Sequence, residues 1–301
     1  MRDASAENDP VISWGNRPVA KLSAGTNAMT VDVEDYFQVE AFFSHINRAE
    51  WDKIECRVEA NVDRILQLFA DHNTTATFFT LGWIAKRYPE MIRRIVANGH
   101  ELASHGWAHI RADHQSRVQF ANDVRRAKLT LEDIGGTAVL GYRATSFSIT
   151  RRNLWALSVI EEEGYSYSSS THPINHDLYG IPEQPRFAFY PFPDSSFLEI
   201  PVTTMRLLGR NWPAGGGGYF RLFPYALFKR NLEMVRSGDQ KPCTFYIHPW
   251  EIDPEQPRIA GVPFKTRFRH YLNLGRTYGR LQKLLGDFRW SSIASVYLSA
   301  S

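Results

Sequence analysis

Short apolar runs alternate with longer amphipathic stretches along the first half of this chain. From residue 27 to residue 168, the short runs are rich in β-branched and aromatic residues, whereas the longer stretches repeat apolar residues every three or four positions. The first pattern predicts strands and the second predicts helices. The expected strands are 27–33, 75–82, 100–104, 138–142 and 165–168, and the expected helices are 58–73, 84–97, 116–134 and 152–163. Strands alternating with helices predict an α/β fold with a parallel sheet, either doubly wound or curled into a barrel.

The alternation is interrupted between residues 170 and 223. This segment holds seven of the 16 prolines, many aromatic residues and the run GGGG at 215–218. It is too long for a structureless connection and predicts hairpins or a functional loop region. The alternation then resumes, with expected elements at 225–236 (helix), 242–248 (strand), 265–286 (helix) and near 293 (helix). We therefore expect one domain over 27–301, with an irregular insertion at 170–223 and a flexible tail at 1–26.

The composition is that of a folded globular protein. Hydrophobic residues make up 43% of the 301 positions and charged residues 22%. The net charge of +3 is spread along the chain, which does not indicate nucleic-acid binding. No apolar run is long enough for a membrane span, and the N-terminal segment lacks a signal-peptide core, so a cytoplasmic location is expected. The two cysteines lie far apart in sequence and predict neither a disulfide framework nor a cysteine metal site.

Two histidines, four residues apart, follow an expected strand. In ASHGWAHI (103–110), His105 and His109 are spaced so that both imidazoles can reach one divalent metal. The nearby pair His100–Glu101 does not begin a zinc-protease motif, because Ser104 stands where the second histidine would be needed. An HxxxH pair also occurs on protein surfaces without function. Its position at a strand end favours a metal site, since ligands in α/β folds gather at the carboxyl ends of strands.

Three acidic residues lie at the end of the first expected strand, in VDVEDYF (31–37). Strand alternation places Asp32 and Glu34 on one face and Asp35 on the other. Asp32 lies between two valines and is expected to point into the barrel or cleft. Two histidines and one carboxylate make a three-ligand site with an open position, as a catalytic zinc-type metal requires. The remaining carboxylate is then a candidate general base. The alternative for Glu34 and Asp35 is a solvated turn.

Two further candidates follow strands later in the chain. Arg143, in GYRATSFSI (141–149), can clamp a carboxylate, although a surface arginine is the alternative. His248, in FYIHPWEID (245–253), can act as a general acid that protonates a leaving amine. Its alternative is a core histidine that is hydrogen-bonded to the backbone.

Taken in order, these motifs resemble those of the polysaccharide deacetylases of carbohydrate esterase family 4. The resemblance covers roughly residues 27–295 and implies the NodB-homology fold, a distorted (β/α) barrel. The first motif of the family is usually Thr-Phe-Asp-Asp, whereas here it is TVDVED (30–35). This variant is similar to the branch that contains peptidoglycan deacetylase-like and exosortase-associated exopolysaccharide deacetylases. SHGWAH, GYRATSFS, YIHPWE and GGGGYFRLFP also resemble the exosortase-associated group.

The resemblance implies catalytic roles for the matched residues. Asp32 corresponds to the catalytic base, Arg143 to the arginine that pairs with the base, and His248 to the general acid. His105 and His109 correspond to the metal-binding histidines. The metal is expected to be Zn, with Co, Ni or Mn as alternatives.

The third metal ligand is either Glu34 or Asp35, because two additional residues interrupt the usual acid pair. Alternation favours Glu34, whereas a bulge would bring in Asp35, which otherwise orients a histidine. The backbone N–H near Ser146 corresponds to the oxyanion donor, although Ala144–Thr145 replace the proline usual beside the arginine. Candidates for an aromatic wall against a sugar ring, or for core packing, are Trp107, Phe147 and Trp250.

The function implied by the resemblance is metal-dependent hydrolysis of N-acetyl groups on an amino-sugar polysaccharide, in exopolysaccharide biosynthesis. The expected partner is an acetylated polysaccharide or oligosaccharide, and the sequence does not define the oligomeric state. One alternative is a metal-independent amide hydrolase of the allantoinase or cyclic-imidase kind. Asp32, His105 and His109 argue against that alternative, because such sites lack the full metal set. The other alternative is a non-catalytic carbohydrate-binding protein.

Overall fold

A curled sheet of eight strands forms the centre of the computed structural model, which describes residues 12, 14, 17, 19, 25–176 and 179–298. The expected N-terminal tail lies almost entirely outside the described residues. The strands of the sheet are β1 (Thr26–Val33), β2 (Thr77–Thr80), β3 (Glu101–Ser104), β4 (Gly141–Tyr142), β5 (Tyr167–Ser168), β6 (Leu198–Glu199), β9 (Thr244–Ile247) and β10 (Arg289–Ser291). Their order is β10-β1-β2-β3-β4-β5-β6, and β9 also pairs with β1. Every pairing in this sheet is parallel.

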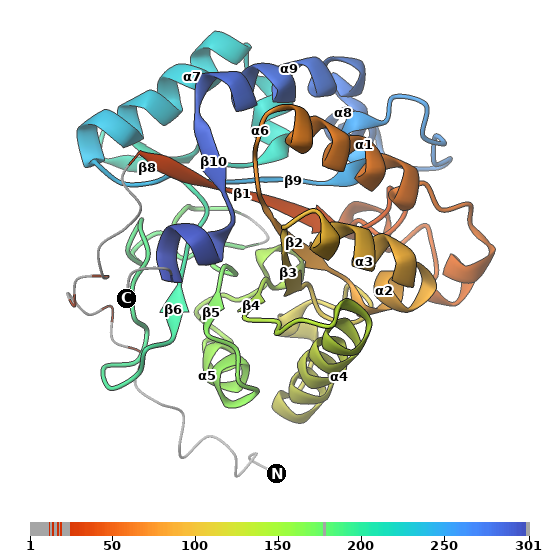
Figure 1. Cartoon of the computed structure of the whole chain (residues 1–301), viewed down its shortest axis with the longest axis horizontal. Coiled ribbons are helices and arrows are strands. Elements are labelled where there is room, and N and C mark those ends of the chain that lie inside the picture. Colours follow the sequence, from red (N-terminus) through yellow and green to blue (C-terminus); the bar gives the residue numbers. More distant parts are fainter. Residues whose placement is uncertain are drawn as a thin grey trace.

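Helices cover the outside of the sheet, as Figure 1 shows. They are α1 (Val58–Asp71), α2 (Gly82–Arg87), α3 (Pro89–Ala97), α4 (Arg117–Gly135), α5 (Trp155–Glu162), α6 (Gly217–Leu222), α7 (Tyr225–Met234), α8 (Phe264–Tyr271) and α9 (Leu274–Asp287). The apolar stripe of α1 is fully buried, including Val62, Ile65 and Phe69. Because β2 has both faces covered, all four of its residues are buried, as a parallel strand requires. The distorted (β/α) barrel expected from the sequence is confirmed.

Local chemistry explains where several helices begin and end. Ser116 and Gln119 form a capping box at the start of α4, and Gly136 ends the helix in the left-handed region. The expected helix 84–97 is two helices, α2 and α3, because Pro89 cannot donate a backbone hydrogen bond and starts a new helix. The expected helix 265–286 is likewise divided into α8 and α9, at Asn273, which has a φ of 54°.

The segment 170–223 contributes to the sheet as well as to the surface. It supplies β6, the antiparallel hairpin of β7 (Thr204–Leu207) and β8 (Arg210–Pro213), and the short helix α6. Its glycine run lies against β9. A side chain at Gly215 would overlap the carbonyl of Thr244, and one at Gly216 would overlap the ring of Tyr246. The run therefore permits a close approach between two backbones.

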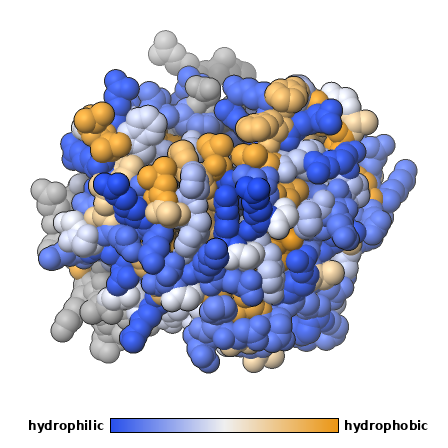
Figure 2. All heavy atoms as spheres, turned by 90° about the horizontal axis from the view of Figure 1, so that it is seen from above, coloured by the Kyte–Doolittle hydropathy of each residue, from blue (hydrophilic) through white to orange (hydrophobic). Residues whose placement is uncertain are grey.

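The surface over α7 and α9 mixes hydrophilic and apolar side chains, and the apolar ones form several separate groups (Figure 2). Leu227 and Met234 of α7 are among the exposed apolar residues. Within the described part of the chain, none of the helices combines the length and apolar character needed to cross a membrane.

Candidate active site

The candidate residues gather because they follow the ends of neighbouring parallel strands. Asp32 lies in β1 and Glu34 follows it, while His105, Arg143 and His248 come directly after β3, β4 and β9. Since parallel strands end at the same edge of the sheet, these side chains meet there. Except for Arg143, which is fully buried beneath, they line a cleft of about 920 Å³.

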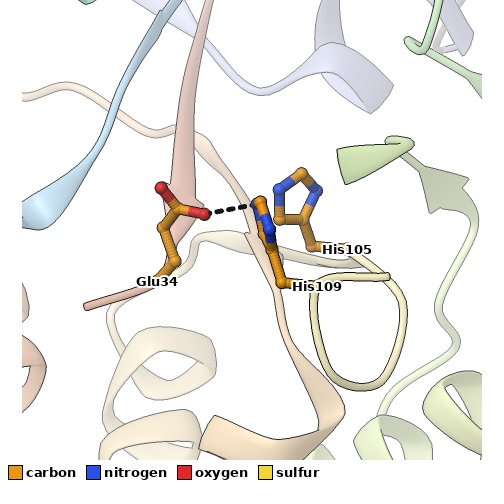
Figure 3. A group of neighbouring side chains, drawn as sticks. All are labelled: Glu34, His105 and His109. Atoms are coloured by element: carbon orange, nitrogen blue, oxygen red, sulfur yellow. Dashed lines mark ion pairs between the residues drawn. The ribbon is translucent and has the colours of Figure 1, made fainter. Parts of the chain in front are cut away.

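Glu34, His105 and His109 form a buried group of potential metal ligands (Figure 3). One ligand atom from each residue lies within 4.8 Å of those of the other two. Glu34 Oε2 is 2.7 Å from His109 Nε2, yet it has no well-aligned hydrogen-bond partner among the described residues. Such a buried oxygen is expected where a cation completes the site.

The protonation states of this group fit a divalent metal. His105 Nδ1 lies 2.8 Å from the backbone carbonyl of Arg143, so Nδ1–H donates to it and Nε2 stays free as a ligand. Burial lowers the pKa of His105 to about 4, which favours the neutral imidazole that binds metals. Burial alone would raise the pKa of Glu34, but His109, His248 and His105 lower it to about 2. The donor set is thus one carboxylate and two histidines, which suits Zn²⁺.

Asp35 points away from this group and caps a helix. Its Oδ2 accepts the backbone N–H groups of Arg57 (2.6 Å) and Val58 (2.9 Å), at the start of α1, and its Oδ1 accepts that of Tyr36 (2.8 Å). Burial raises the pKa of the Asp35 carboxyl to about 6, despite these three hydrogen bonds. Of the two acids considered as a third ligand, the structure brings only Glu34 to the histidines.

The loop that carries both histidines has a strained backbone and is held by Arg48. Gly106 and His109 adopt left-handed backbone conformations, with φ of 76° and 53°. Arg48 donates to the carbonyl oxygens of Ala108 (2.8 Å) and His109 (2.9 Å). These bonds fix the strained turn that aims the His109 ring at Glu34.

Asp32 is paired with a fully buried arginine. Arg143 has no exposed surface, and its NH1 donates to Asp32 Oδ1 (2.6 Å) and to Thr30 Oγ1 (2.7 Å). Its other nitrogens donate to the backbone carbonyl and the hydroxyl of Ser169 (3.1 and 2.9 Å). The second oxygen of Asp32, Oδ2, stays on the side of the cleft, 3.9 Å from His248 Nε2.

His248 is held by a carboxylate that sequence reasoning did not assign. Its Nδ1 lies 2.8 Å from Glu251 Oε1, and Glu251 Oε2 accepts from Arg221 Nε (2.6 Å). Burial would lower the pKa of His248, but the negative charges of Glu34, Glu251 and Asp32 raise it to about 9. His248 is therefore protonated at neutral pH.

The sequence did contain a signal for Glu251. In His-Pro-Trp-Glu, proline starts a helical turn and glutamate stands at its third position, which is the pattern of a capping box. Glu251 accordingly accepts the backbone N–H of His248 (3.1 Å) as well as its ring. No comparable signal marks Arg221, which reaches the site from α6.

The four candidates for substrate contact have different positions. Ser146 and Phe147 line the cleft, and both have positive φ values (53° and 49°). Trp250 also lines the cleft and donates from Nε1 to Glu34 Oε1 (3.2 Å). Trp107 is not among the lining residues. Its ring packs against Gly82, and the Arg126 guanidinium lies 3.5 Å from its centroid, so the structure does not bring it to the sugar-binding side.

The fold is a curled β/α barrel, and its cleft places Glu34, His105 and His109 beside Asp32 and His248. This arrangement is a candidate site for metal-assisted hydrolysis. Residues 50–167 match the family model described as polysaccharide deacetylase, and residues 169–298 match a domain of unknown function, DUF3473. The chain carries a polysaccharide deacetylase domain of the NodB-like, carbohydrate esterase family 4 type, as its motifs indicated. The site draws on both matched segments, because His105 and Arg143 lie in the first and His248 in the second.

Several curated proteins resemble shorter parts of the chain. A chitooligosaccharide deacetylase of Sinorhizobium fredii is 49% identical over 45 residues, which cover 15% of this chain and 21% of that protein. A peptidoglycan-N-acetylglucosamine deacetylase of Bacillus cereus is 24% identical over 123 residues, covering 37% and 45%. The chain thus spans less than half the length of either relative.

One solved structure matches the fold over most of its length. A protein from Mycobacterium smegmatis described as a polysaccharide deacetylase has a TM-score of 0.59 and 18% sequence identity, with 92% of each chain covered. At this level of identity the match establishes the shared fold.

Proposed function

We propose that this protein is a metal-dependent deacetylase that hydrolyses the N-acetyl groups of an amino-sugar polysaccharide during exopolysaccharide biosynthesis. The observation that carries the proposal is the buried group of Glu34, His105 and His109, in one cleft with Asp32 and His248. The polysaccharide deacetylase domain and the names of the matched relatives support this choice of substrate class.

Glu34, His105 and His109 would hold the metal, for which Zn is the first candidate. When bound, such a metal supplies Lewis acidity, which polarises an acetamide carbonyl and makes water a stronger nucleophile. The roles of the remaining residues follow from their own contacts.

Asp32 is the proposed general base. Arg143 engages one of its oxygens and balances its charge, so the other oxygen can accept a proton from the attacking water. His248 is the proposed general acid, because its raised pKa of about 9 keeps a proton on the ring at neutral pH. Once the carbonyl carbon has become tetrahedral, His248 gives this proton to the departing amine. The products are acetate and a free amino sugar.

The lining of the cleft includes aromatic rings that suit a sugar chain. Phe147 and Tyr179 line it, with their ring centroids 6.0 Å apart. Trp250 is held by His270, whose ring stacks on it at 4.2 Å. The rings of Phe147 and Tyr179 offer flat apolar surfaces to the faces of sugar rings, whereas Trp250 is only 6% exposed and also stacks on His248.

Acetate release from acetylated chitooligosaccharides tests this proposal, together with the metal content of the purified protein. We expect about one divalent ion per chain and an activity that a chelator removes and Zn²⁺ restores. The double variant Glu34→Ala, His105→Ala should lose both the metal and the activity. The matched control is His114→Ala, which removes a histidine from the cleft rim and should leave the metal content unchanged. Full activity in the double variant would rule out the metal-dependent mechanism.

The same experiment separates the two alternatives. A metal-independent amide hydrolase would stay active after chelation and would prefer a small cyclic amide to the oligosaccharide. A non-catalytic carbohydrate-binding protein would bind the oligosaccharide and release no acetate with any metal. The placement of Glu34 Oε2 beside His109, without a well-aligned hydrogen bond, favours the metal-dependent enzyme over both.

A further inference from the structure

Helix α8 presents two adjacent phenylalanines to the outside of the molecule. Phe264 is 82% exposed and Phe268 is 50% exposed, one helical turn apart. Their rings lie nearly parallel, with centroids 6.4 Å apart. Neither residue lines the catalytic cleft. Exposed apolar rings of this size, placed side by side, mark an interaction surface rather than an isolated exposed residue.

The C-terminal end of α8 is fixed to the protein, so the helix cannot rotate to bury these rings. His270 is buried, stacks on Trp250 and lies 2.7 Å from Gln256 Oε1 through its Nε2. Tyr271 packs on Phe42, and its hydroxyl accepts the backbone N–H of Ile259 (2.9 Å). The outward orientation of Phe264 and Phe268 is therefore a property of the folded state.

Positive charge surrounds the two rings. Lys265, Arg267 and Arg269 of α8 are all exposed. The 31 residues from 256 to 286 contain seven lysines and arginines and no aspartate or glutamate. We call Phe264, Lys265, Arg267, Phe268 and Arg269 the α8 face. It lies at the periphery of the molecule, next to α9 (Figure 1).

We propose that the α8 face binds the surface of an anionic lipid membrane. Amphipathic helices bind membranes in this way, with aromatic side chains inserted at the headgroup boundary and lysines and arginines on the anionic headgroups. A protruding pair of phenylalanines flanked by lysine and arginine suits a soft, flat surface that carries anionic groups. A groove lined by aromatic and polar groups would instead indicate a sugar chain, and the cleft already provides one.

The position of α8 links this surface to the cleft. His270 on its inner side stacks on Trp250, which lines the cleft beside Glu34. A protein attached through α8 would therefore hold its cleft near the membrane, where a lipid-attached polysaccharide substrate would be within reach.

Cosedimentation of the full chain with vesicles tests the proposal. We expect binding to vesicles that contain phosphatidylglycerol and none to pure phosphatidylcholine, with weaker binding as the salt concentration rises. The double variant Phe264→Ser, Phe268→Ser should bind at least about tenfold more weakly. Lys265→Glu, Arg267→Glu should weaken binding most at low salt. The matched control is Leu208→Ser, which removes a 92% exposed apolar residue from the β7–β8 turn and should bind as the native chain does.

Two results would overturn the proposal. One is binding to anionic vesicles that the α8 variants do not change. The other is an absence of vesicle binding by the native chain, including the case in which the α8 face retains an acidic polysaccharide instead. Acetate release from a short soluble oligosaccharide, measured on the same variants, should be unchanged, since no residue of the α8 face lines the cleft. This readout keeps the inference independent of the proposed enzymatic function.

Discussion

Each of the two proposed reactive side chains, Asp32 and His248, is supported by a buried arginine. The arginine contacts Asp32 directly, but it reaches His248 only through a third residue. On the base side, Arg143 touches Asp32 directly. On the acid side, Arg221 touches Glu251, and Glu251 in turn touches His248. The base side is a pair, whereas the acid side is a chain of three.

The difference follows from the charge that each proposed role requires. A general base has to be negative before reaction, so a cation in direct contact suits it. A general acid has to keep a proton, so His248 needs an anion beside it, and a neighbouring guanidinium would repel that proton. Glu251 is this anion. Burial would raise its pKa, but Arg221 and His248 lower it to about 2, so it stays ionised. A buried arginine therefore helps to keep Asp32 deprotonated on one side and, through Glu251, helps to keep His248 protonated on the other.

Removing Arg143 should give the largest effect, because it leaves Asp32 as an unpaired buried charge. We expect Arg143→Met to lower the free energy of unfolding by about 3–5 kcal/mol and to abolish deacetylation. Urea unfolding measures the first and acetate release the second. Arg117→Ala is the control, since Arg117 pairs with Glu162 at the surface and its loss should cost less than about 1 kcal/mol. Native stability in Arg143→Met would show that the ion pair does not support Asp32.

A methyl group at Gly217 should disturb the acid side alone. A Cβ there would overlap the Glu251 carboxylate, whereas one at Gly218 would have no atom within 4 Å. We expect Gly217→Ala to cost about 1–3 kcal/mol of stability and to lower kcat. Gly218→Ala should be neutral or stabilising by up to about 1 kcal/mol, because alanine favours a helix. Equal effects of the two substitutions would contradict the role assigned to the close contact.

Neutralising Glu251 should shift the pH profile. In the native protein, the pKa of His248 is raised from 6.5 to about 9, so its proton is held below that pH and lost above it. Glu251→Gln removes the nearest anion, and the alkaline limb of kcat should move to lower pH. At pH 8 we expect roughly tenfold lower activity, with a smaller loss at pH 6. An alkaline limb that does not move would contradict Glu251 as the residue that maintains the proton.

Linkage predicts a matching change in stability. Because the folded-state pKa of His248 is above its ordinary value, the stabilisation from its proton is complete below pH 6.5. That stabilisation is lost as the pH rises through about 9. Glu251→Gln should flatten this part of the curve of unfolding free energy against pH.

Asp35→Asn should have the smallest effect on the metal. The variant keeps one acceptor oxygen but loses part of the cap on α1, which should cost about 1–2 kcal/mol of stability. Metal content should stay at the native level, whereas Glu34→Gln should lower it severely. Loss of the metal in Asp35→Asn but not in Glu34→Gln would reverse the assignment of the third ligand.

Periodicity predicted much of the barrel, and strand alternation predicted which acid meets the histidines. Asp32 and Glu34 share the cleft as strand alternation predicts, although β1 ends at Val33 and Glu34 is the first residue after it. The fate of Asp35 depended on a tertiary contact, since its partners at 57 and 58 begin a helix that a loop separates from β1. Local sequence carries no record of such a contact.

The acid side was predicted less completely, for a related reason. His248 follows a clear strand, but the arginine that completes its support comes from α6, 30 positions before Glu251. The sequence places the run at 215–218 only in a segment of hairpins or functional loops, whereas each of its first three glycines is required by a close approach. Trp107 shows the opposite case. It was a candidate for an aromatic wall or for core packing, and the turn at Gly106 directs its ring to α2.

The pairing of β1 has a consequence for how the molecule is made. This strand comes from the start of the chain, and two of its neighbours, β9 and β10, come from residues 244–247 and 289–291. During synthesis, β1 can pair early with β2, but it cannot pair with β9 and β10 until residues 244–291 have been made. The cleft also needs His248, which is added only after β9. The reactive cleft is therefore among the last parts of the protein to form.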